Sequence, residues 1–127
     1  MIGQLNSKLT DKMSTVTILP VSTYELDKEY TPEYDARNCI YFIPIIIWNR
    51  TPVIVKNWYD NTYDAIEGSL VTSGSDIGVI RKVRFLVNMT TGTIKVKDYH
   101  QTNLQSGSTW FINPNPVEGL GLLGIIS

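Results

Sequence analysis

The chain is poor in the residues that metal proteins and most hydrolases depend on. Its 127 residues include one cysteine and one histidine. A single cysteine excludes an intramolecular disulfide and a metal cluster held by cysteines, and one histidine makes a poor metal site. We therefore expect no metal, no cofactor and no enzymatic activity.

An excess of charge of either sign is also missing. Lys and Arg together number 11, Asp and Glu together number 12, and the net charge is -1. The molecule as a whole therefore has no electrostatic attraction for nucleic acid or for an anionic membrane. No apolar run is long enough to span a bilayer. We expect no nucleic-acid partner and no transmembrane span.

The N-terminal residues lack the basic segment followed by an apolar segment that marks a signal peptide. A periplasmic or cell-envelope location is therefore favoured only if a signal peptide has been removed, and the compartment is otherwise open. Residues 1–13 are polar and nonperiodic, and we interpret them as a flexible arm or as residues derived from a vector.

What the sequence does have is one uncharged run, from Cys39 to Trp48, that is rich in β-branched and aromatic residues. Such a run is typical of a strand that is covered on both faces, and we predict that it is the central strand. Pro44 interrupts it and cannot donate a ladder hydrogen bond, which predicts a bend at Ile43 and Pro44.

Two further patterns predict strands. Residues 14–19 are β-branched and alternate at first, which predicts a strand there. Residues 77–89 and 93–99 alternate as a β-hairpin does, and one dry face is kept when Met89 pairs with Ile94 and Val87 pairs with Val96.

A helix is predicted from about residue 52 to 68. Thr51 is a good N-cap, Pro52 is a good first helical residue, and apolar residues follow at spacings of three and four. The alternative is a hairpin in which residues 53–59 pair with the apolar run. With the helix, the fold class is α+β: a mainly antiparallel sheet of four to five strands with one amphipathic helix packed on one face.

The length predicts one domain, over residues 14–112. The sequence Asn113-Pro114-Asn115-Pro116 then stops regular structure, and residues 113–127 form an apolar, glycine-spaced tail. Such a tail either folds back over the core of its own domain or docks onto another chain by strand addition or groove insertion.

Few residues could carry chemistry. His100 stands beside Asp98 and could act as a general base, but no serine or cysteine lies in a recognisable nucleophile motif. We interpret His100 as a solvated residue at a strand end and Cys39 as a buried thiol that behaves as a small apolar group. No catalytic, metal or cofactor-binding residue is predicted.

Two groups of residues are candidates for binding a protein partner. The basic side of the predicted hairpin would suit an acidic partner, although a solvated sheet face is the plainer interpretation. The tail supplies apolar side chains that could dock onto another chain. The predicted partner-binding residues are Lys82, Arg84, Lys95, Lys97, Leu120, Leu122, Leu123 and Ile125.

A family resemblance rests on three short stretches. They are Cys39 with Phe42, Ile43, Pro44 and Ile45, then Tyr63, Ala65 and Ile66, then Asp76, Ile77 and Val79. In this order the chain resembles small bacterial cell-envelope lipoproteins of the TRL-like kind, although it shows no lipobox. The resemblance implies a non-enzymatic envelope protein and carries over no functional residues.

The function predicted from the sequence is that of a non-catalytic bacterial envelope or accessory protein that acts through protein–protein interaction. The alternative is a structural subunit of a phage virion or secretion apparatus that assembles through its C-terminal tail. Self-association into a homo-oligomer is compatible with both.

Overall fold

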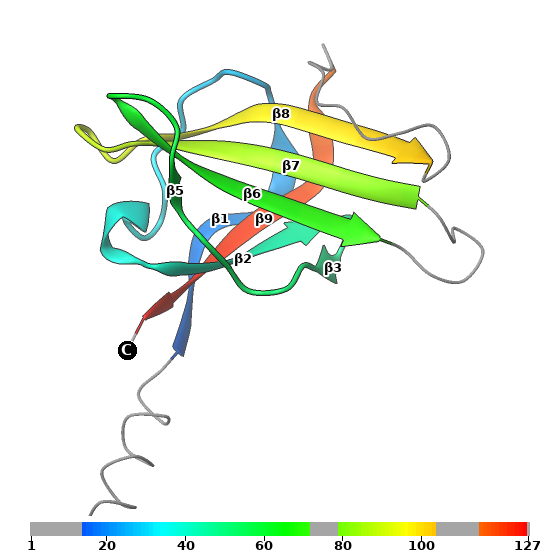
Figure 1. Cartoon of the computed structure of the whole chain (residues 1–127), viewed down its shortest axis with the longest axis horizontal. Helices are drawn as coiled ribbons and strands as arrows, with labels where there is room; N and C mark the ends of the chain where they lie inside the picture. Colours follow the sequence, from blue (N-terminus) through cyan, green and yellow to red (C-terminus); the bar gives the residue numbers. More distant parts are fainter. Residues whose placement is uncertain (1–13, 72–78, 104–114, 127) are drawn as a thin grey trace, which may run out of the picture.

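The fold is built almost entirely from β-strands (Figure 1). The structure, a computed structural model, describes residues 14–71, 79–103 and 115–126, so the predicted arm at 1–13 lies outside it. The strands are β1 (Ser14–Tyr24), β2 (Tyr41–Ile46), β3 (Asn49–Arg50), β4 (Ile54–Val55), β5 (Asn57–Trp58), β6 (Tyr63–Val71), β7 (Val79–Asn88), β8 (Ile94–Asn103) and β9 (Val117–Ile126). The one helical segment in these ranges is a 3-10 turn, η1 (Ala36–Asn38). The predicted α+β class is therefore wrong.

The predicted helix at 52–68 is replaced by β4, β5 and most of β6. Asp60 begins a tight turn instead: its side chain accepts hydrogen bonds from the backbone amides of Thr62 and Tyr63, both at 2.8 Å. This Asx-type turn reverses the chain and allows β5 to pair with β6. The residues around it are rich in β-branched and aromatic types, which favours strands. The hairpin alternative is confirmed only for Ile54 and Val55, which pair with β2, whereas the following strand, β5, pairs with β6.

The strands form two sheets that pack face to face. Sheet A has the order β1-β9-β2-β3, with β4 also paired to β2, and sheet B has the order β5-β6-β7-β8. Figure 1 shows sheet B in front of sheet A, with the last strand, β9, lying between β1 and β2. Leu26 and Tyr30 bridge to Val96 and Ile94, so the segment after β1 crosses to the edge of β8.

The apolar run forms β2, an inner strand of sheet A, as the sequence predicted. Pro44 does not interrupt it, because β2 pairs with β9 without a shift from Tyr41 to Ile46. On its other side β2 pairs with β4 at Tyr41 and Phe42 and with β3 at Ile45 and Ile46. Pro44 lies in the gap between these two short strands, where a missing donor is tolerated.

The apolar tail forms β9, which pairs antiparallel with both β1 and β2. Its glycines are positions of close approach. A Cβ atom on Gly124 would lie 2.7 Å from Cys39 Sγ, and one on Gly121 would lie 2.9 Å from Val21 Cγ2. The glycine spacing therefore lets other parts of sheet A pack against the strand on both of its faces.

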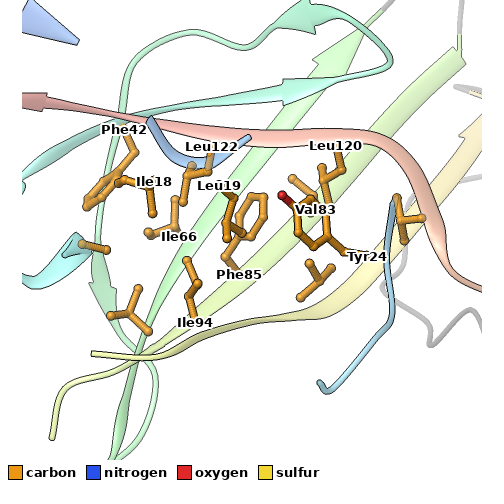
Figure 2. Close-up of a cluster of buried hydrophobic side chains, with 14 of the residues drawn as sticks. Ile18, Leu19, Tyr24, Phe42, Ile66, Val83, Phe85, Ile94, Leu120 and Leu122 are labelled. Atoms are coloured by element: carbon orange, nitrogen blue, oxygen red, sulfur yellow. The ribbon is translucent and has the colours of Figure 1, made fainter. Parts of the chain in front are cut away.

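The core lies between the two sheets (Figure 2). Side chains of sheet A meet side chains of sheet B, and the largest of them are fully buried. Those that Figure 2 labels are Ile18, Leu19, Tyr24, Phe42, Leu120 and Leu122 from sheet A, and Ile66, Val83, Phe85 and Ile94 from sheet B. Burial of this apolar surface is the main stabilising contribution to the fold.

The hairpin of β7 and β8 is present, but its predicted register is wrong by two residues. Val87 pairs with Ile94 and Phe85 pairs with Val96. The turn closes with a hydrogen bond from the Asn88 amide to the Thr93 carbonyl at 2.8 Å, and the Asn88 side chain accepts from Thr90 and Thr91. The dry face survives because a shift of two keeps every side chain on its side of the sheet.

Gly68 of β6 gives a test of how closely the sheets approach. A Cβ atom there would lie 2.8 Å from Cγ and 3.0 Å from Cβ of Pro44, whose ring cannot move away by rotation. We expect Gly68→Ala to lower the free energy of unfolding by about 1–3 kcal/mol, measured by urea denaturation. Where a methyl group fits, a glycine-to-alanine change stabilises a protein by about 0.4–1 kcal/mol, because it reduces the conformational entropy of the unfolded chain.

The neighbouring exposed residue supplies the control. Ser69→Ala should change the free energy of unfolding by less than about 0.5 kcal/mol. If Gly68→Ala were as stable as the wild type, the sheets would not be in contact at Pro44.

Candidate interaction surface

The outer face of sheet A, which points away from the core, is apolar. The ladder pairs place Tyr41, Ile125 and Val55 in one row and Ile43 and Leu123 in the next, and Ile45 lies opposite Gly121. We call the six apolar side chains the outer apolar face: Tyr41, Ile43, Ile45, Val55, Leu123 and Ile125. Thr15 and Thr17 of β1 border it, and the one charged residue in these rows is Arg50, opposite Ile45.

This face is open to solvent in the single chain. Tyr41 is 45% exposed, Val55 is 44% exposed, and the other four members are half-buried. The prediction that β2 is covered on both faces is therefore wrong, since only the side with Phe42 and Ile46 is buried. Contiguous apolar patches of a few hundred Å² on a soluble protein commonly mark interaction sites.

The outer face of sheet B differs sharply. There Arg84 Nε lies 3.0 Å from Glu67 Oε1 and Arg84 Nη1 lies 2.7 Å from Asp98 Oδ2. Lys95 Nζ lies 4.6 Å from the centre of the Tyr63 ring. Charged side chains and tyrosines therefore cover this sheet, whereas nothing comparable covers sheet A in the described residues.

The predicted basic site is part of this network. Lys97 Nζ lies 3.2 Å from Asp27 Oδ1 and Lys95 Nζ lies 4.0 Å from the same atom, while Lys82 pairs across the ladder with His100. Acidic side chains of the same chain therefore contact Arg84, Lys95 and Lys97, and the two lysines share the one carboxylate of Asp27.

The predicted tail residues separate into two groups. Leu120 and Leu122 are fully buried and belong to the core, whereas Leu123 and Ile125 lie on the outer apolar face. Sequence reasoning missed Tyr41, Ile43 and Ile45 because a continuous apolar run hides the alternation between the two faces. It missed Val55 because that residue lay in the predicted helix. The exposed face could be found only by knowing which side of β2 meets sheet B.

The hairpin turn beside this face is strained. Ile47 and Trp48 form the two-residue connection between β2 and β3, with φ of 51° and 66°. Asn and Gly are the residues that usually occupy such left-handed positions, and a β-branched residue there is an outlier. The Ile47 amide donates to the Gly119 carbonyl at 2.7 Å, which holds the turn against β9. Strain of this kind clusters at functional sites.

Three titratable groups bear on the question of catalysis: Cys39, His100 and Asp98, all of them buried. Burial raises the pKa of the Cys39 thiol, an effect that Lys56 opposes, so the reactive thiolate is disfavoured. Burial and the charge of Lys82 lower the pKa of His100, and Arg84 occupies the Asp98 carboxylate. Within the described ranges there is no group of three side chains that could hold a metal and no helix that could span a membrane.

Comparison of the chain with protein-family models, with curated proteins and with solved structures gives no match. The surface of the molecule is therefore the guide to its function.

The two acids that share Arg84 allow the basic network to be tested. Asp98 is 8% exposed at its side chain and Glu67 is 48% exposed. We expect Asp98→Asn to lower the free energy of unfolding by about 2–3 kcal/mol at pH 7, since it leaves a largely buried guanidinium short of a partner. Glu67→Gln should cost less than about 1 kcal/mol. If urea denaturation gave the same loss of unfolding free energy for both variants, Arg84 would not be held in a buried ion pair.

Proposed function

We propose that this protein is a non-catalytic interaction protein that assembles with a second copy of itself through the outer apolar face. The observation that carries the proposal is the contrast between the two sheets: the outer face of sheet B is covered by ion pairs of the same chain, and that of sheet A is apolar and open.

A second copy is the occupant that this face suits best. In a two-fold dimer the same patch meets itself. A charged residue near the centre of the patch would therefore face the identical charge of the second copy and be repelled by it. The rows through Tyr41 and Ile43 contain no charge, and Arg50 lies at the border. Two such sheets can pack face to face at a separation of about 10 Å, as in β-sandwiches.

The size of the face indicates a weak dimer. Four strands about 4.8 Å apart and about five residues long give a face of roughly 300–400 Å². Stable complexes bury about 800 Å² on each partner. We therefore expect a reversible dimer whose dissociation constant is micromolar or weaker.

Assembly by face packing replaces the predicted exchange of the tail. Residues 117–126 form a strand that is paired on both edges, so transfer to a neighbour would break two ladders. Leu123 and Ile125 would still contribute to assembly, from their place on the outer apolar face. The predicted envelope location, which follows from the resemblance, stays a prediction.

The test is the solution mass at increasing protein concentration. We expect light scattering on the wild-type chain, from about 10 to 500 µM, to show a rise from monomer toward dimer. Ile43→Lys places a charge at the centre of the face and should keep the chain monomeric. Tyr41→Lys, at a residue already 45% exposed, should act similarly with little effect on stability.

The matched control is Val71→Lys, which also introduces a lysine at an exposed apolar residue, but on β6 of sheet B. It should dimerise as the wild type does. A wild type that stays monomeric at the highest concentration, or a dimer that Ile43→Lys and Tyr41→Lys leave intact, would overturn the proposal.

A further inference from the structure

A groove lies at the end of sheet A, beside the strained turn. It has a volume of about 350 Å³, which is at the lower end of the range for ligand pockets. Val21, Ser22 and Thr23 of β1 form one side, and Ile47 and Trp48 form another. Glu118 and Gly119 of β9 complete the lining.

The turn presents an indole to solvent from a fixed backbone. Trp48 is 76% exposed, the highest exposure among the large apolar residues of the described chain. Gly119 also has positive φ, at 68°, and a Cβ atom there would lie 3.2 Å from Ile47 Cα. The close contact between the two backbones, together with the Ile47 hydrogen bond, fixes the position from which Trp48 projects.

The groove carries one charge, and it is negative. Glu118 is exposed, and no lysine or arginine of the described residues forms an ion pair with it. By contrast, Asp35, Glu67 and Asp98 are each paired with an arginine of the same chain. The groove therefore has an uncompensated carboxylate next to an exposed aromatic ring and the apolar side chains of Val21 and Ile47.

From this combination we infer that the groove binds a lysine or arginine side chain of a partner protein. The aliphatic stem of such a side chain packs on apolar groups while its charged end stays polar. An indole attracts the cation, and a carboxylate forms a charge-assisted hydrogen bond with it. A sugar would also stack on Trp48, but its neutral hydroxyls would gain no Coulombic attraction from Glu118.

The experiment uses the whole chain and a blocked peptide, Gly-Gly-Lys-Gly-Gly, followed by NMR. We expect the peptide to shift the Trp48 indole N–H and the Glu118 amide in a saturable manner. The same peptide with norleucine in place of lysine should bind at least about threefold more weakly, and added salt should weaken binding of the lysine peptide. Ile43→Lys, which lies on the outer apolar face, should bind the peptide as the wild type does, so this test is independent of dimerisation.

Two variants remove the two recognition elements. Glu118→Gln and Trp48→Gly should each lower the affinity about two- to fivefold, as expected for a surface ion pair and a surface cation–π contact. Trp48→Gly should also raise the urea midpoint, because glycine adopts positive φ without strain. A gain in stability together with a loss of binding separates recognition from a folding defect.

The controls are of the same residue types. Trp58 is 73% exposed on β5 and Glu33 is exposed on the loop before η1, so Trp58→Ala and Glu33→Gln should leave peptide binding unchanged. Equal binding of the lysine and norleucine peptides, no shift at Trp48, or stronger shifts by the disaccharide cellobiose would overturn the inference.

Discussion

Sheet A is held together by β9, which lies between β1 and β2 and pairs with both. Through this one strand the residues near the start of the described chain pair with those near its end, as Thr15 does with Ile125. Without β9, the two strands that contain Ile18 and Phe42 would have no common neighbour, and sheet A would not close over the core. Pairing between segments this distant in sequence carries a large loop-closure cost and is expected to form late.

The close packing around β9 explains why a strand can be both apolar and rich in glycine. Gly124 faces Cys39 and Ile18 inside the core, whereas Gly121 meets Val21 on the other side of the strand. The leucines beside them alternate in the same way: Leu120 and Leu122 are buried, and Leu123 is on the outer apolar face. The same strand therefore completes the core and supplies part of the proposed dimer surface.

The two proposed sites use different physical chemistry and lie on different parts of sheet A. The outer apolar face depends on the absence of charge over several rows of the ladder, which permits contact with an identical surface. The groove depends on one unbalanced carboxylate, Glu118, and one indole, Trp48, held on a strained turn. Stability and recognition are opposed at that turn, since the residues that would relieve the strain would remove the aromatic ring.

Local composition and alternation were enough to predict the strand at residues 14–19, an inner strand within the run from Cys39 to Trp48, and the dry face of the hairpin. The sequence did not determine residues 52–68, where apolar residues on both faces of a strand, such as Ala65 and Ile66, also produce spacings of three and four. There the Asp60 turn decided the outcome. Nor could the sequence show that β2 is exposed on one side, or that Arg84 is held by Glu67 and Asp98. Those features arise only when distant strands pair and the two sheets stack, because pairing sets which side of each strand faces the core.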